Sequence, residues 1–263
     1  MCIRDRVVAA LLVADADAAS GVNGADGASG VVDVLAGDTL NGVSASLADV
    51  DISVVTPADP VVAGSPVPVL DPATGLVDVP AGTPAGSYTI RYEICEELNP
   101  DNCSQNDVTI TVDAAQVVAG PANASGINGS SGQTGVVNVF TGSMVNGVAA
   151  GPGNAVLSLP AGVEVPAGLT FDPVTGLVSV DPGTSAGTYT FTYQICEALN
   201  PDNCETALVT VEVVAADIVA DADAASGVNG ADGASGVVDV LAGDTLNGVS
   251  ASLADVDLSL IHI

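Results

Sequence analysis

The sequence contains no tryptophan, one histidine and only three lysine and arginine residues, against 32 aspartates and glutamates. The net charge of −29 at pH 7 argues against binding to nucleic acid or to an anionic membrane surface, since both require lysine and arginine. No apolar run approaches the roughly 20 residues of a membrane-spanning helix. We therefore expect no nucleic-acid partner and no membrane insertion within this sequence.

The residues that commonly transfer protons in catalysis are equally scarce. The single histidine, His262, lies at the extreme end of the chain, and lysine is missing from the sequence. A pair of carboxylates can replace them only when a cleft holds the two at a defined separation. Asp71 and Asp172 recur in corresponding turn sequences, DPATG and DPVTG, so we interpret them as turn residues. We expect no enzyme activity and no required cofactor.

The two ends of the chain are related to each other as DNA. One DNA segment translates as MCIRDR, and its reverse complement translates as LSLIHI; the segment resembles a transposon end used to prepare sequencing libraries. We expect residues 1–6 and 258–263 to be artefactual, adapter-derived segments and exclude them from the fold analysis. Residues 7–11 are then the tail of a preceding repeat, because the sequence VVAA occurs again at 213–216.

The rest of the sequence consists of tandem repeats. Val13–Asp51 and Val219–Asp257 are identical, and a diverged copy begins at Val117. Such internal repetition is a better guide to domain number than chain length. The first and third copies are of one type, and the second copy is of another. We predict a first repeat over 12–113, a second repeat over 114–216 and a truncated third copy over 217–257.

Each complete repeat contains short segments in which apolar and polar residues alternate. The most regular are GSYTIRYEICEELNPDNC at 86–103 and GTYTFTYQICEALNPDNC at 187–204. A period of two indicates a strand with one buried face. With turn sequences between about seven such strands in each repeat, the sequence predicts an all-β fold of tandem immunoglobulin-like antiparallel β sandwiches. The core residues expected from these two segments are Tyr88, Ile90, Tyr92, Ile94, Tyr189, Phe191, Tyr193 and Ile195.

The segments LDPATGLVDVPAGTPAGSYTIRYEI and AGLTFDPVTGLVSVDPGTSAGTYTFTYQI resemble the immunoglobulin-like and cadherin-like tandem repeats of large secreted bacterial surface proteins of the adhesin type. The resemblance implies an extracellular or cell-surface location in a bacterium. It also implies a function as a structural spacer or stalk, with neighbouring repeats of the same chain as partners. The alternative is that the repeats are calcium-rigidified adhesion modules that bind a glycan, protein or surface ligand themselves.

Four cysteines form two closely spaced pairs, Cys95 with Cys103 and Cys196 with Cys204, and each pair encloses the turn-forming sequence LNPDN. Paired cysteines in a secreted β protein are usually bridged, so we predict two disulfides. A zinc site would need four ligands, whereas each repeat supplies two thiols and no histidine. Reduced thiols are the remaining alternative.

An Asp-Ala-Asp sequence lies beside the predicted start of the first repeat and recurs in the third copy. Calcium takes six to eight oxygen ligands, so carboxylates that converge at a repeat junction can bind it and stiffen the array. Gly120 and Ala122 replace the two aspartates in the second repeat, which limits calcium to alternate junctions. The alternative is that these carboxylates are simply solvated. The predicted calcium ligands are Asp15, Asp17, Asp221 and Asp223.

Overall fold

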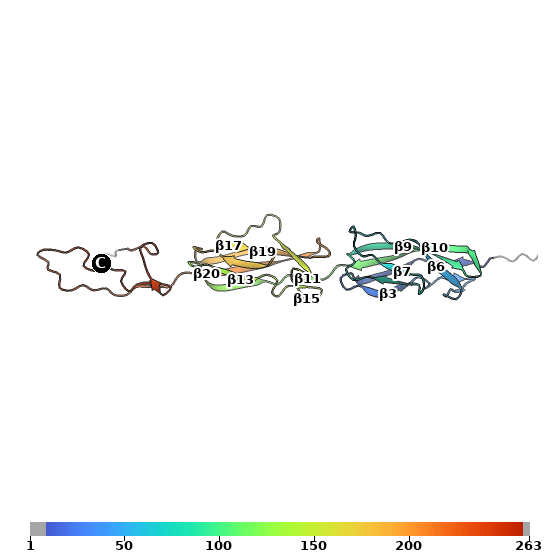
Figure 1. Cartoon of the computed structure of the whole chain (residues 1–263), viewed down its shortest axis with the longest axis horizontal. Helices are drawn as coiled ribbons and strands as arrows, with labels where there is room; N and C mark the ends of the chain where they lie inside the picture. Colours follow the sequence, from blue (N-terminus) through green and yellow to red (C-terminus); the bar gives the residue numbers. More distant parts are fainter. Residues whose placement is uncertain (1–8, 260–263) are drawn as a thin grey trace, which may run out of the picture. The chain divides into compact units, whose positions relative to one another are not determined.

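The computed structural model describes residues 9–259, and every regular element in that range is a β-strand (Figure 1). The prediction of an all-β fold is confirmed. The predicted adapter-derived segment 1–6 lies outside the described residues, as do residues 260–263 of the corresponding segment at the other end. Residues 9–259 include no helix that is long and apolar enough to cross a membrane.

Ten strands lie in the first repeat: β1 (Leu12–Val13), β2 (Asp17–Asn23), β3 (Ala28–Asp33), β4 (Thr39–Leu40), β5 (Val43–Ser44), β6 (Val50–Thr56), β7 (Val69–Asp71), β8 (Leu76–Val79), β9 (Gly86–Glu96) and β10 (Asn99–Asp113). They form a four-stranded sheet in the order β2-β10-β9-β6, a three-stranded sheet β3-β8-β7 and a small ribbon β1-β4-β5. β10 is parallel to β2 and antiparallel to β9. The two larger sheets make the predicted immunoglobulin-like sandwich.

The second repeat has the same strand order. Its sheets are β12-β20-β19-β16, β13-β18-β17 and the ribbon β11-β14-β15. The strands are β11 (Val117–Val118), β12 (Ala122–Asn128), β13 (Gln133–Asn138), β14 (Met144–Val145), β15 (Val148–Ala149), β16 (Ala155–Ser158), β17 (Leu169–Phe171), β18 (Leu177–Val180), β19 (Gly187–Glu197) and β20 (Cys204–Val214). The third copy contains only a ribbon of β21 (Ile218–Val219), β22 (Thr245–Leu246) and β23 (Val249–Ser250).

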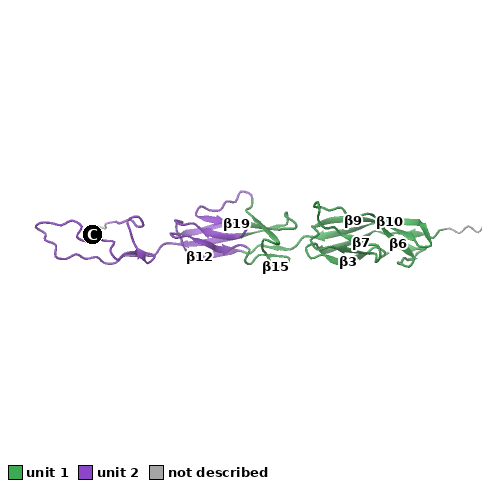
Figure 2. Cartoon of the chain, viewed as in Figure 1, with its two compact units in different colours: residues 1–120, 140–160, 193–207 green, residues 121–139, 161–192, 208–263 purple. Residues whose placement is uncertain are grey.

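The chain divides into two compact units, coloured green and purple in Figure 2. Unit 1 takes the residues up to Gly120 together with Phe140–Pro160 and Tyr193–Ala207. Unit 2 takes Pro121–Val139, Ala161–Thr192 and the residues from Leu208 onward. These divisions do not follow the repeats of the sequence, whose boundaries stay predictions.

Tyrosine and isoleucine side chains of β9 form the centre of the first core. Tyr88, Ile90, Tyr92 and Ile94 are each at most 1% exposed, as the alternating pattern predicts. In β19 the prediction is wrong at one position, because Tyr189 is only half-buried. In the first repeat, Val61 and the ring of Tyr88 converge on Gly86, within 4 Å of the position that a Cβ would take there. The second repeat is four residues shorter in this region, and the Tyr189 hydroxyl donates to Ser185 O at the surface.

The turns have the conformations that their sequences predict. Asn41 and Gly42, between β4 and β5, have φ values of 54° and 77°, which belong to a type I′ hairpin turn. In the DPVTG turn, Asp172 accepts hydrogen bonds from the Thr175 hydroxyl at 2.6 Å and from Val174 N at 2.9 Å. These bonds, the Thr175 bond foremost, lower the pKa of the Asp172 carboxyl. The interpretation of this aspartate as a turn residue is confirmed.

The third copy shows how far the strands depend on residues distant in sequence. Residues 219–257 have the same sequence as 13–51, but they form only the ribbon β21-β22-β23. Val34 is fully buried, whereas its counterpart Val240 is 50% exposed. In the first repeat, β2 and β3 pair with β10 and β8, which come later in the chain. Within residues 9–259 the third copy has no counterpart of these two partner strands.

Candidate functional site

The hydroxyl of Tyr92 lies among oxygen atoms from several segments of the first repeat. It is 2.8 Å from Asp15 O, 3.0 Å from Asp17 Oδ2 and 3.1 Å from Val34 O. A tyrosine hydroxyl carries one proton, so it can donate fully to only one of the three acceptors at a time. Burial, followed by the negative charge of Asp38, raises the pKa of Tyr92, and the hydroxyl stays protonated.

A buried carboxylate lies beside this hydroxyl. Asp38, in the turn before β4, is 0% exposed. Its Oδ1 accepts a hydrogen bond of 2.6 Å from Asp15 N, while its Oδ2 has no hydrogen-bond partner among the described residues. Burial raises the pKa of Asp38 to about 6; the charges of Asp17 and Asp15 add to the rise, and hydrogen bonding to Asp15 N and to the Tyr92 side chain opposes it.

Four aspartates therefore belong to one group, which we call the acidic cluster. Burial also raises the pKa of Asp17, and the neighbouring charges of Asp33 and Asp15 act in the same direction. Asp38 is buried, Asp17 is half-buried, and Asp15 and Asp33 are exposed, so the cluster has a buried floor and an open rim. The members of the acidic cluster are Asp15, Asp17, Asp33 and Asp38.

Sequence reasoning identified only half of this group. The structure brings the predicted residues Asp15 and Asp17 together with Asp33 and Asp38, which were not singled out. The positions of Asp26, Asp49 and Asp51, outside the cluster, are uncharged in the second repeat too, so the lack of charge at the four cluster positions does not single the group out. The residues of the second repeat at the four cluster positions, in chain order, are Gly120, Ala122, Asn138 and Ser143.

The neutral version of the cluster is a closed network. Tyr193, the counterpart of Tyr92, donates to Gly120 O at 2.6 Å. Ser143 Oγ lies 2.9 Å from the Tyr193 hydroxyl and accepts from Gly120 N at 3.0 Å. One serine thus supplies the contacts that the Asp38 carboxylate makes in the first repeat, without a buried charge.

The third copy reproduces part of the acidic arrangement. Asp221 N donates to Asp244 Oδ1 at 2.7 Å, as Asp15 N does to Asp38. Asp223 is half-buried, and no tyrosine follows residue 193 in the sequence. The structure therefore gathers Asp221 with Asp244, but it provides no counterpart of the Tyr92 hydroxyl.

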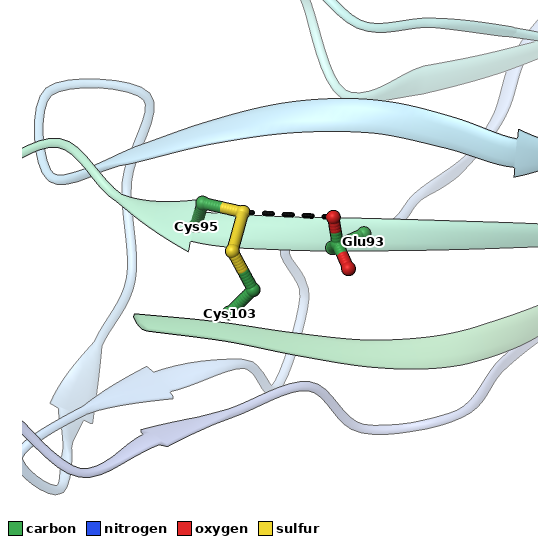
Figure 3. Close-up of side chains that lie close together, drawn as sticks. All are labelled: Glu93, Cys95 and Cys103. Carbon is green, nitrogen blue, oxygen red and sulfur yellow. Dashed lines mark hydrogen bonds between the residues drawn. A yellow bond between two sulfur atoms is a disulfide. The ribbon is translucent and has the colours of Figure 1, made fainter. Parts of the chain in front are cut away.

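Both predicted disulfides are present. Cys95 is bonded to Cys103 with an S–S distance of 2.04 Å, and Cys196 to Cys204 with 2.03 Å. Cys95 and Cys103 are directly opposed on β9 and β10. Figure 3 shows Glu93 beside the first disulfide, with its Oε2 3.7 Å from Cys95 Sγ. Because a disulfide sulfur has no proton to donate and is not a thiolate, we regard this approach as a van der Waals contact and not as a metal site.

The loop that the disulfide closes surrounds a buried glutamate in each repeat. Glu197 is 2% exposed. Its Oε1 accepts from Asn200 Nδ2 at 2.7 Å, and its Oε2 accepts from Asn203 Nδ2 at 2.8 Å and from Ala115 N at 3.0 Å. Glu96 accepts from two asparagines in the same way. The repeated sequence CExxNPxNC is explained by this network, which ties the loop to the segment that enters the repeat.

Asparagine side chains of the second repeat also bind the first repeat, within unit 1. Asn146 Oδ1 accepts from Asn23 Nδ2 at 2.6 Å, and Asn146 Nδ2 donates to Asp26 Oδ2 at 2.7 Å. Asn200 Oδ1 accepts from Ala85 N at 2.7 Å. We call these contacts the asparagine clasp.

The corresponding asparagines of the other copies behave differently. Asn41 Oδ1 accepts from Leu11 N, in the short segment that leads into the first repeat, and Asn247 Oδ1 accepts from Asp217 N of its own copy. At the position of Asp26 the second repeat has Ser131, which offers no carboxylate to a following asparagine. The asparagine clasp thus accompanies the acidic type of repeat.

Comparison with known proteins gives structural neighbours only. No family model matches the chain, and no curated protein matches it. Among solved structures, the chain is similar to protocadherin gamma B2 extracellular cadherin domains 3-6, with 10% identity over 78% of this chain and 51% of that chain, and a TM-score of 0.32. Mouse cadherin-23 EC22-24 is 14% identical, with 78% and 65% coverage and a TM-score of 0.30. The human desmocollin-1 ectodomain is 9% identical, with 78% and 42% coverage and a TM-score of 0.32. The chain covers less than two thirds of each of these structures.

Proposed function

We propose that this chain is a series of spacer repeats from a large extracellular protein, of the kind found on bacterial surfaces. The observation that supports the proposal best is the asparagine clasp, in which side chains of one repeat bind the preceding repeat. In tandem arrays each repeat contacts only its neighbours, and the stability of the array depends on these contacts. The two disulfides fit an oxidising, extracellular environment. The function is mechanical, without catalysis.

The proposal is tested by measuring whether the two repeats move together. Nitrogen-15 relaxation of the full chain gives separate rotational correlation times for residues 12–113 and 114–216. We expect one shared value for the unmodified chain, and separate, shorter values for a variant that combines Asn146→Ala with Asn200→Ala. The control is Asn41→Ala, because Asn41 accepts its hydrogen bond from Leu11 and not from the second repeat. Independent rotation of the repeats in the unmodified chain would contradict a rigid spacer.

The acidic cluster favours a second candidate function, in which calcium stiffens the repeats and the repeats act as adhesion modules for a glycan, protein or surface ligand. Asp15 and Asp17 remain the proposed ligands in the first repeat, and Asp221 and Asp223 in the third copy. Adding calcium after EDTA in the same relaxation experiment separates the two candidates. A spacer moves alike in both conditions, whereas a calcium-stiffened module loses internal motion around Asp15 when calcium is added.

A further inference from the structure

We propose that the acidic cluster of the first repeat is a binding site inside the repeat for a hard divalent cation, and that calcium fits it best. The inference rests on the calcium-dependent candidate function and deepens it, because it names Asp38 as the central ligand. It also places the site at the edge of the sandwich of the first repeat and not at the repeat junction. The observation that carries it is the fully buried Asp38 carboxylate, whose Oδ2 has no hydrogen-bond partner within residues 9–259.

A carboxylate oxygen in this position needs a positive partner. Buried polar atoms in proteins are almost always hydrogen-bonded, and a buried charge without a partner costs several kcal/mol of stability. Asp15 and Asp17 increase the cost because their own charges lie close to Asp38. No lysine exists in the sequence, and the single cation of the first repeat, Arg91, binds Asp107 at 3.5 Å. A bound divalent cation would offset two of the three negative charges.

The surrounding atoms have the chemistry that calcium prefers. Carboxylate oxygens come from Asp15, Asp17 and Asp38, and the carbonyl oxygens of Asp15 and Val34 face the same tyrosine hydroxyl. Calcium accepts six to eight oxygen ligands in flexible geometry, whereas magnesium requires a near-ideal octahedron. An irregular set of carboxylates and carbonyls, open to water on one side, therefore suits calcium better.

The side chains have to move when the ion binds. In the described part of the chain, only Glu93, Cys95 and Cys103 bring three acidic or sulfur ligand atoms within 4.8 Å of one another. The acidic cluster is therefore not closed around an ion in this structure. Asp15 and Asp33 are exposed, and Asp33 would have to give up the hydrogen bond that its Oδ1 accepts from Leu35 N in order to turn toward Asp38.

The second repeat is an internal control for the proposal. It keeps the tyrosine, Tyr193, but replaces the buried carboxylate with Ser143, and the remaining hydrogen bonds are complete. Four carboxylates are thus lost together at positions that lie together in the fold. Asp26, Asp49 and Asp51, which lie outside the cluster, are replaced as well, so the second repeat supplies the matched residues for a test and is not itself evidence of an ion.

The proposal is tested by titrating the full chain, first stripped with EDTA, with calcium and then with terbium. Terbium takes the same oxygen ligands as calcium and emits light when a nearby excited tyrosine transfers energy to it. The chain has no tryptophan, so its four tyrosines are the donors, and variants confined to the first repeat show whether the emission comes from the acidic cluster. Calcium affinities of extracellular modules are about 10⁻⁴–10⁻³ M, and the titration should extend beyond that range.

We expect tyrosine-excited terbium emission that calcium displaces, with affinity for both ions at least tenfold weaker in Asp38→Ser. That variant should fold, because serine occupies the same position in the second repeat. A fourfold variant with Asp15→Gly, Asp17→Ala, Asp33→Asn and Asp38→Ser should lose the signal. Two results would overturn the proposal: no binding by the unmodified chain, which would mean that a proton satisfies Asp38, or equal binding by the fourfold variant. Neither result affects the spacer function, whose relaxation test is run in EDTA.

Discussion

The buried glutamate of the second disulfide loop allows a quantitative prediction. Glu197→Ala removes an acceptor that receives hydrogen bonds from Asn200, Asn203 and Ala115 N. The two asparagines are half-buried and can turn toward water, but Ala115 is 3% exposed and its N–H cannot. One stranded buried donor costs about 1–3 kcal/mol, and each asparagine hydrogen bond that is exchanged for one with water costs about 0.5–1.5 kcal/mol. We therefore expect unfolding free energy to fall by about 3 kcal/mol.

Two matched variants make the prediction specific. Glu197→Gln keeps the shape of the side chain and one acceptor oxygen, so it should cost about 1 kcal/mol. Glu96→Ala should lower the unfolding free energy by about 1–2 kcal/mol, because within residues 9–259 the Glu96 carboxylate accepts from the side chains of Asn99 and Asn102 and from no buried backbone N–H. Amide hydrogen exchange in increasing urea reports the stability of each repeat separately. A loss below about 1 kcal/mol for Glu197→Ala, or a larger loss for Glu96→Ala, would refute the reasoning.

Three further predictions concern the first repeat. Replacing Cys95 and Cys103 by serine should lower the unfolding free energy by about 2.5 kcal/mol, because the disulfide closes a short loop. Urea unfolding of this double variant, with the other disulfide intact, measures the loss. Gly27→Ala should lower the unfolding free energy by about 2–3 kcal/mol, because Gly27 has φ 68° and a Cβ there would lie 2.5 Å from backbone atoms. The control is Gly42→Ala, which has open space around it and should lower the unfolding free energy by about 1 kcal/mol. Arg91→Ala should change the unfolding free energy by less than about 1 kcal/mol, because its ion pair is half exposed.

The parts of the fold that the sequence predicts well are those with a local pattern. β9 alternates strictly between apolar and polar residues, and its inward side chains are buried as expected. β2 was missed, because its sequence DAASGVN has no such alternation. It exists because β10, which lies far along the chain, pairs with it in parallel. Pairings of this kind are not visible in a short window of sequence.

The same limitation applies to the candidate site. The Asp-Ala-Asp sequence was easy to notice, but Asp38 lies 23 residues after Asp15 and reaches it through a hydrogen bond to the Asp15 backbone. Nothing in the local sequence around Asp38 distinguishes it from an ordinary turn aspartate. Comparison with the second repeat does not reveal the group either, because every aspartate of residues 13–51 is replaced there, inside and outside the cluster.

The identity of residues 13–51 and 219–257 bears on how such an array is made. While the chain is being synthesised, each copy passes through a stage in which its first half has no partner strands, as the exposed Val240 illustrates. Identical elements of tandem repeats are prone to exchange with one another, which traps swapped and misassembled forms. A diverged copy separates the two identical segments here. When the two types of repeat alternate, the neighbour of a half-synthesised repeat is of the other type, and its strands fit that half less well than the strands of the same repeat. We therefore expect alternation to favour correct assembly of the array.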